Sequence, residues 1–421
     1  MKILFTNTTL AHRTGSELYV LEVARALLAR GHQPVAWSPV LGELAAEIRA
    51  AGVPVIDDLA ALAELSGVPD LIHGQHHLET MTALLRFPGT PGIFVCHGAL
   101  PWEEAPPRFP RLYRYLAVDE ATRERLTAAA VPAERITTLL NFVDLARFRP
   151  RASTSPLPPR PRRALVFSNS ASEATFLPAV RAASAAAGLA LDVAGIASGR
   201  PAACPEALLP GYDLVFAKGR SALEAMAVGA AVVLCDSAGC GPLVTAADFD
   251  RLRQRNFGLR SLTEPVEPAI LERQIARYDP EDAARVSERV RAEAGLESAV
   301  DRLVEIYESV LAEPAPAAPE TDAAGEERRA AAAYLGWLNP YVKERGRLLI
   351  DRDALWRRVH GLTAELAAAS GELAAERERT ANLRAELASQ RATATWRLRE
   401  ALLARPGVVR LYRLLRGLPA A

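Results

Sequence analysis

The stretch KILFTNTTLAHRTGSELYVLEVARALLARGHQPVAW, residues 2–37, decides the fold of this protein. It opens with a short apolar run at residues 2–5, and a helical pattern follows at residues 17–30, with its apolar side chains on one side and Gly31 as its stop. A second apolar run lies at residues 34–37. This order predicts a strand, a helix and a second strand, and such a crossover connects parallel strands.

The same alternation continues along the 421 residues, which are enough for at least two domains. We predict further strands at residues 54–56, 71–73, 93–97, 116–119, 164–168, 190–194, 213–216 and 232–236, and helices at 173–187, 221–228, 281–294 and 296–312. The proline- and arginine-rich residues 151–163 cannot form regular structure and separate two similar patterns. The fold class is therefore α/β, with Rossmann-like domains at residues 1–150 and 164–312 joined by the linker 151–163.

The remaining residues predict a helical extension. We predict a flexible linker at residues 313–327 and helix at residues 328–421. Six residues fall on heptad core positions and predict a coiled coil at about 361–390, and with it a homo-oligomer: Leu362, Leu366, Ala369, Leu373, Leu383 and Leu387. Residues 391–421 interleave seven arginines with apolar side chains, a pattern that suits either an anionic membrane surface or a partner helix.

Composition excludes several classes of protein. Fifty basic residues balance fifty acidic ones, so no overall field favours nucleic acid. The four cysteines lie in separate segments without a CxxC pair, which is typical of buried thiols in a reducing compartment. The first apolar run is too short for a signal peptide, and none approaches the ~20 residues of a membrane span. We expect a cytoplasmic protein, which lies at the inner face of the membrane if the basic tail binds the anionic surface and not a partner helix.

Several short motifs occur in one order along residues 1–312. They are RTGSE (13–17), DLIHGQHH (70–77), IFVCHG (93–98), LLNFVD (139–144) and SALEAMAVGAAVVLCD (221–236). Together they resemble the family 4 glycosyltransferases, and TATWRLREAL (393–402) is similar to the tails of bacterial cell-surface polysaccharide glycosyltransferases. The resemblance implies the GT-B fold of two facing Rossmann-like domains, a nucleotide-sugar donor, and a glycan or lipid-linked acceptor.

The donor site is expected at Gly219, between a predicted strand and the helix that Ser221 opens. Free backbone amides and the helix dipole attract phosphate at such a position. Lys218 and Arg220 flank the glycine, and cationic donors there would stabilise the charge that develops on a leaving diphosphate. The resemblance assigns Glu224, one turn into the helix, to the two ribose hydroxyls.

Three further segments are expected at the cleft between the domains. His97 ends a strand, where open α/β sheets bind ligands, and the resemblance implies that it contacts the transferred sugar. Gly15 and Ser16 are expected to approach the diphosphate or the acceptor from the opposite wall. Gly239 and Gly241, in a predicted loop, would let the backbone approach the donor closely.

The sequence departs from the family pattern in two places. Phe216 stands where the family carries a glutamate that contacts the donor sugar, and residues 168–176 lack the family's Arg and Lys pair. A second hypothesis therefore stays open, namely a catalytically silent GT-B protein that acts as a scaffold in polysaccharide assembly. A nicotinamide-dependent dehydrogenase is excluded, because no GxGxxG follows the first strand of either domain.

No metal ion or other cofactor is expected, since the nucleotide sugar is a substrate. The DFD at residues 248–250 mimics a metal-binding DxD, but the DRD at 351–353 shows the same pattern arising in a helical tail. His73, His76 and His77 point to different faces of a strand, so we interpret them as structural or acceptor-side residues. The resemblance implies retention of anomeric configuration, with attack by the acceptor on the face that the nucleotide leaves.

Overall fold

The computed structural model describes residues 1–152, 156–313 and 322–417. Met1–Tyr334 form one compact unit and Leu335–Ala421 belong to a second. Parts of the two expected linkers, residues 153–155 and 314–321, lie outside the described residues, as do the last four residues of the tail.

The N-terminal domain is a parallel sheet in the order β3-β2-β1-β4-β5-β6-β7. Its strands are β1 (Lys2–Thr6), β2 (Gln33–Trp37), β3 (Val55–Ile56), β4 (Leu71–Gln75), β5 (Gly92–Cys96), β6 (Leu112–Ala117) and β7 (Ile136–Thr138). Its helices are α1 (Gly15–Ala29), α2 (Glu43–Ala50), α3 (Leu62–Leu65), α4 (His77–Arg86) and α5 (Glu120–Ala128), and a one-turn 3₁₀ helix, η2, covers Trp102–Glu104. The sequence predicted the first six strands and missed β7, because three residues are too few for a hydrophobic pattern.

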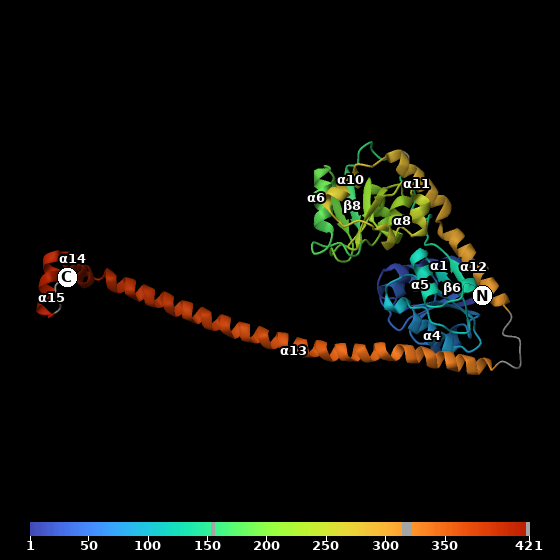
Figure 1. Cartoon of the computed structure of the whole chain (residues 1–421), viewed down its shortest axis with the longest axis horizontal. Helices are drawn as coiled ribbons and strands as arrows, with labels where there is room; N and C mark the ends of the chain where they lie inside the picture. The colour runs from blue at the N-terminus through green and yellow to red at the C-terminus, as the bar shows by residue number, and fades with distance from the viewer. Residues whose placement is uncertain (153–155, 314–321, 418–421) are drawn as a thin grey trace. The chain divides into compact units, whose positions relative to one another are not determined.

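The C-terminal domain has a smaller sheet in the order β12-β11-β10-β8-β9. Its strands are β8 (Arg163–Phe167), β9 (Ala190–Ala194), β10 (Leu214–Ala217), β11 (Ala231–Asp236) and β12 (Gly239–Leu243). Its helices are α6 (Leu177–Ala186), α7 (Pro205–Leu208), α8 (Gly219–Ala227), α9 (Phe249–Gln254), α10 (Pro268–Ile275) and α11 (Pro280–Glu293). Figure 1 shows α6, α8 and α10 around this sheet, and α1, α4 and α5 around the other.

The edge strand β12 corrects the expected loop after β11. It pairs antiparallel with β11, and Cys235 lies opposite Cys240 in this hairpin. Both thiols are buried, but Cys204 is exposed, so the expectation of four buried cysteines is wrong for that residue.

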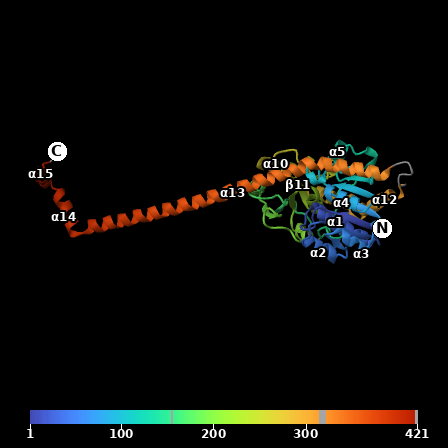
Figure 2. The same cartoon turned by 90° about the horizontal axis from the view of Figure 1, so that it is seen from below.

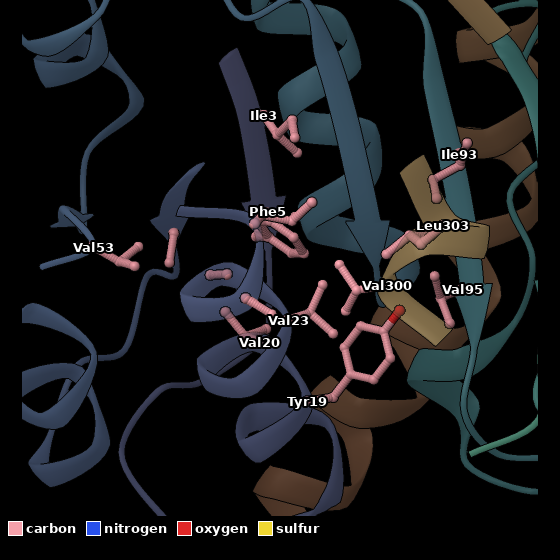
Figure 3. Packing of buried hydrophobic residues seen from close by; sticks show 14 of the residues in the cluster. Ile3, Phe5, Tyr19, Val20, Val23, Val53, Ile93, Val95, Val300 and Leu303 are labelled. Carbon is pink, nitrogen blue, oxygen red and sulfur yellow. The ribbon is translucent and has the colours of Figure 1, made fainter. Parts of the chain in front are cut away.

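Helix α12 (Leu296–Ala312) corrects the expected domain boundary at residue 312. Its buried stripe of Val300, Leu303 and Tyr307 packs in the core of the N-terminal domain, although the sequence stretch follows the C-terminal domain. Figure 3 shows Val300 and Leu303 beside Val95 of β5 and Tyr19 of α1, and Figures 1 and 2 both place α12 next to α1. The chain therefore crosses back, and α12 ties the two domains together.

Helix α13 (Ala323–Ala392) also differs from the expected boundaries. Residues 323–327 are helical, so the expected flexible linker up to residue 327 is wrong there. Glu327 bonds the buried guanidinium of Arg111 at 2.7 Å, and the Tyr334 hydroxyl lies 2.7 Å from Nδ1 of His77 at the start of α4. These polar anchors fix the first turns of α13 to the N-terminal domain. Beyond them, α14 (Ala394–Leu403) and α15 (Pro406–Leu415) complete the described tail.

Candidate functional site

Three polar side chains stand at the carboxyl ends of neighbouring strands of the N-terminal sheet. Asn7 follows β1, Gln75 ends β4 and His97 follows β5. Asn7 Nδ2, both amide atoms of Gln75 and His97 Nε2 are buried and find no hydrogen-bond partner in the described part of the chain. Native proteins leave few such atoms without a partner, so this row is a candidate place for a ligand with several polar groups.

Helix α1 adds two more polar groups to this row. The Tyr19 ring meets the His97 ring edge to face, with centroids 4.8 Å apart, and the buried Tyr19 hydroxyl has no partner among the described residues. Glu22 follows one turn later and is also buried. Burial, with the charges of nearby His76 and Arg220, lowers the pKa of His97 to about 3. His97 is therefore a neutral imidazole at pH 7, able to share hydrogen bonds with hydroxyl groups.

The start of α8, in the C-terminal domain, contacts α1 across the domain boundary through Arg220 and Glu22. Gly219 has a φ of +57°, which favours glycine, and a Cβ built there would meet no atom within 4 Å. Its amide donates to the carbonyl of Phe257 at 2.8 Å, so the expectation that this amide is free is wrong. Helix geometry leaves the amides of Arg220 and Ser221 without an intrahelical acceptor. The first turn of α8 contains no acidic residue, so its positive end is available to an anion.

Arg220 lies buried between two carboxylates. Its Nε donates to Glu224 Oε1 at 3.0 Å, and its Nη2 pairs with Glu22 of the N-terminal domain. Burial alone would lower the pKa of Arg220, but Glu22 and Glu224 raise it overall. Burial raises the pKa of Glu224, and Arg220 opposes this only in part. The Arg220 guanidinium is therefore buried and pairs with carboxylates of both domains. Glu224, the expected ribose ligand, is 6% exposed and lies beside Arg220 at the domain boundary.

Lys218 belongs to a second polar cluster at the carboxyl ends of β8, β10 and β11. Its Nζ lies 3.4 Å from Asp236 Oδ2, and the hydroxyls of Ser168 and Ser170 donate to the same carboxylate at 3.0 and 2.7 Å. Burial works against ionisation of Asp236, but Lys218 and the hydroxyls lower its pKa overall. The sequence placed Lys218 here and missed Asp236, although a polar run directly after an apolar strand was the available signal.

The start of α1 differs from the start of α8. Gly15 begins the helix, and a Cβ there would also meet open space. However, the hydroxyls of Thr14 and Ser16 both donate to the carboxylate of Glu17. That carboxylate already complements the positive end of α1, so a diphosphate at Gly15 and Ser16 would meet a like charge. The expected role of these two residues in holding the diphosphate is therefore not favoured.

Gly239 and Gly241 lie in β12 and not in a loop. A Cβ on Gly239 would stand 2.9 Å from the carbonyl oxygen of Glu264, and one on Gly241 would stand 2.3 Å from that of Ser261. The close approach that these glycines allow is therefore to the protein's own backbone. Phe216 is fully buried in β10 and places no polar atom at the site.

The histidines and aspartates considered as metal ligands have other partners. His73 bonds the Tyr307 hydroxyl, and Asp248 and Asp250 pair with Arg251 and Arg289. Among the residues that the structure describes, no group of three or more histidine, cysteine or acidic side chains is placed to hold a metal ion.

Besides Asp236, four residues of this site were not predicted from the sequence: Asn7, Tyr19, Glu22 and Gln75. The signal for Glu22 was a carboxylate in the largely apolar helix α1, and for Asn7 and Gln75 it was a polar residue at the end of a buried strand. Neither signal tells which strands are neighbours. The order β1-β4-β5 decides that these residues meet.

Two facing Rossmann-like domains, with α12 returning to the first, define the GT-B fold. Residues 13–147 match the model of Glycosyltransferase Family 4. Among solved structures, the chain is similar to Alr3699/HepE from Anabaena, in complex with UDP and glucose, with a TM-score of 0.54 at 15% identity over 73% of this chain and 100% of that one. The same protein in complex with UDP-glucose gives a TM-score of 0.52 at 15% identity, over 73% and 100% of the two chains. The comparison with curated proteins gave no match.

Proposed function

We propose that this protein is a glycosyltransferase that moves a sugar from a nucleotide-sugar donor to a glycan or lipid-linked acceptor in cell-surface polysaccharide synthesis. One observation carries the proposal. The start of α8 has no side-chain cap, is flanked by Lys218 and Arg220, and lies across the domain boundary from α1. Helix α1 in turn lies beside His97, in the row of polar groups without partners among the described residues. One wall suits a diphosphate and the other suits sugar hydroxyls. The match to Glycosyltransferase Family 4 and the HepE complexes support the same assignment.

Each residue of the site has a distinct role in this proposal. The amides of Arg220 and Ser221 and the ammonium group of Lys218 hold the diphosphate, and Glu224 accepts hydrogen bonds from the ribose. The acceptor hydroxyl attacks the anomeric carbon from the face that the diphosphate leaves, the bond to the diphosphate oxygen breaks, and the hydroxyl proton passes to the departing phosphate. Lys218 and Arg220 stabilise the charge on that phosphate without a metal ion. Attack on this face retains the anomeric configuration.

A Glu224→Gln variant tests the enzyme proposal. The amide keeps the shape of the side chain but loses the charge that ribose hydroxyls and Arg220 require. A charged hydrogen bond contributes about 1.5–3 kcal/mol, so kcat/KM should fall at least about tenfold. Transfer or hydrolysis of a panel of nucleotide sugars is the measurement, and Glu272→Gln, on the exposed face of α10, is the matched control.

Unchanged turnover in Glu224→Gln would contradict this assignment. The silent-scaffold alternative is favoured by Phe216, which buries an aromatic ring where the family resemblance places a donor-contacting carboxylate. That alternative predicts nucleotide-sugar binding, weakened by Glu224→Gln, with no turnover of any donor in the unmodified protein. The same panel therefore separates the two functions.

The tail has two proposed roles. The heptad leucines, Leu362 and Leu366 among them, are exposed in the single chain, so we propose that they pair with a second copy as a coiled coil. Helix α15 presents exposed Leu411, Leu414 and Leu415 together with arginines, which suits peripheral contact with an anionic membrane at its inner face. Among the described helices, none is both long and apolar enough to cross a bilayer.

Removing residues 393–421 should separate the two roles of the tail. The shortened chain keeps the heptad seam, so it should remain a dimer at micromolar concentration in analytical ultracentrifugation. It loses six of the seven arginines, each worth about 1 kcal/mol near an anionic surface, so sedimentation with phosphatidylserine vesicles should be lost. A monomeric full-length chain would contradict the coiled coil, and undiminished vesicle binding by the shortened chain would contradict the membrane role.

A further inference from the structure

A cavity of about 300 Å³ opens where the two domains meet near β7. Thr138 and Phe142 line it from the N-terminal domain, and Arg253 and Gln254 line it from α9. Gly295 and Ser298, at the start of α12, complete the wall. The cavity is large enough for a phosphate or carboxylate group carried on a small molecule.

Arg253 is the unusual residue of this cavity. It is 6% exposed, and the one hydrogen bond of its side chain among the described residues runs from Nη1 to Asn256 Oδ1 at 3.4 Å. Burial lowers the pKa of Arg253 to about 10, with Glu293 opposing, so the guanidinium still carries its charge at pH 7. A buried cation without a hydrogen-bonded counter-charge is costly, and a bound anion would remove that cost.

The start of α12 lies in the same wall and has the matching polarity. This helix has 17 residues, and Gly295 is its N-cap. The Leu296 amide donates to the carbonyl of Val143, whereas helix geometry leaves the amides of Glu297 and Ser298 without an intrahelical acceptor. Glu297, the acidic residue in this first turn, pairs with Arg30 at 2.7 Å. The positive end of α12 and the buried guanidinium of Arg253 therefore both favour an anion in the cavity.

The acidic residues of the cavity are already engaged. Asp250 and Glu293 line it, and Arg289 holds both, at 2.5 and 2.9 Å. Arg302, the other cation in the wall, pairs with Glu305 at 2.5 Å. Of the described cations that line the cavity, Arg253 is the one without a carboxylate partner. These pairs leave its charge for a ligand.

The cavity is connected to the start of α8. Asn256, the partner of Arg253, and Phe257 both adopt positive φ, at 53° and 51°, which is strained for residues other than glycine. The carbonyl of Phe257 accepts from the Gly219 amide at 2.8 Å. A ligand that reorients Arg253 would thus act on the turn that supports the proposed diphosphate site.

We propose that this cavity binds an oxyanion, a phosphate or carboxylate group, through Arg253 and the amides of the first turn of α12. The site is separate from the proposed nucleotide-sugar site, and it does not depend on the glycosyltransferase proposal.

Calorimetric titration of the full chain with inorganic phosphate and with glucose 6-phosphate tests this site. Saturable binding is expected, and Arg253→Met should weaken it about tenfold or more, because a charged hydrogen bond is lost. Arg253→Lys keeps the charge without the planar fork and should give an intermediate affinity. The matched control is Arg251→Met, on the same helix, where the side chain is exposed and pairs with Asp248.

The outcomes are separable from the test of glycosyl transfer. Absence of saturable binding by the unmodified chain, or equal binding by Arg253→Met, would overturn the proposal. Loss in Lys218→Met but not in Arg253→Met would assign the anion to the start of α8 and would overturn it as well. If the Met variant does not fold, the Lys variant decides, since unchanged affinity there contradicts recognition by the fork. Tighter binding of glucose 6-phosphate indicates an anion carried by a substrate, and tighter binding of phosphate indicates a free anion.

Discussion

Arg220→Met is expected to destabilise the protein by about 3–5 kcal/mol at pH 8, because it leaves Glu22 and Glu224 buried without their shared cation. Removing one partner of a buried ion pair costs more than the pair itself contributes. The measurement is the midpoint of urea unfolding, followed by a probe in each domain. Since Glu22 and Glu224 belong to different domains, both probes should report the loss.

The effect of Arg220→Met should depend on pH in a defined direction. Burial already raises the pKa of Glu224 above its ordinary value of 4.5, and loss of Arg220 raises it further. An acid with a raised pKa in the folded state binds protons more tightly folded than unfolded, so stability falls as the pH rises above about 4.5. The difference between the variant and the unmodified chain should therefore shrink from pH 8 to pH 5.

Two outcomes would count against this account of Arg220. A difference that does not change with pH would show that the carboxylates stay compensated without Arg220. A loss no larger than that of Arg251→Met, whose guanidinium is exposed, would show that the pairing across the domains contributes little. The control shares the substitution but removes a solvent-screened ion pair.

Tyr307→Ala is expected to destabilise the protein by about 3–5 kcal/mol, the range for a large aromatic side chain removed from a core. Tyr307 of α12 is fully buried in the N-terminal core, where its hydroxyl bonds His73. Tyr307→Phe keeps the ring and should cost about 1–3 kcal/mol, because the His73 nitrogen is left without its partner. Chemical denaturation of both variants measures the two contributions separately.

The control for Tyr307 is Leu311→Ala, one turn later on α12, where the side chain is 39% exposed. It should change stability by less than about 0.5 kcal/mol. If Tyr307→Ala costs no more than this control, α12 does not tie the chain back to the N-terminal domain as described. Such a result would assign α12 to the C-terminal domain, as the sequence alone predicted.

Local sequence patterns predicted much of the fold. Apolar runs separated by amphipathic helices predicted the central strands of both sheets, because strands buried on both faces must be apolar along their whole length. The short or edge strands β7 and β12 were not predicted, because neither has the length or the continuous apolar character that identifies a strand. The start of α8 was also predicted from local sequence, because a glycine between a strand and a helix indicates where the first amides of the helix lie.

The sequence by itself determined the α/β class, the two-domain division and the placement of Gly219, Lys218, Arg220 and Glu224 around one helix start, because each follows from residues close together in the chain. Only the tertiary structure decided that Arg220 pairs with Glu22 across the domains, that α12 belongs to the first core, and that Asn7, Gln75 and His97 form one row. These contacts join residues far apart in sequence, and strand order and domain packing, which no local pattern encodes, bring them together.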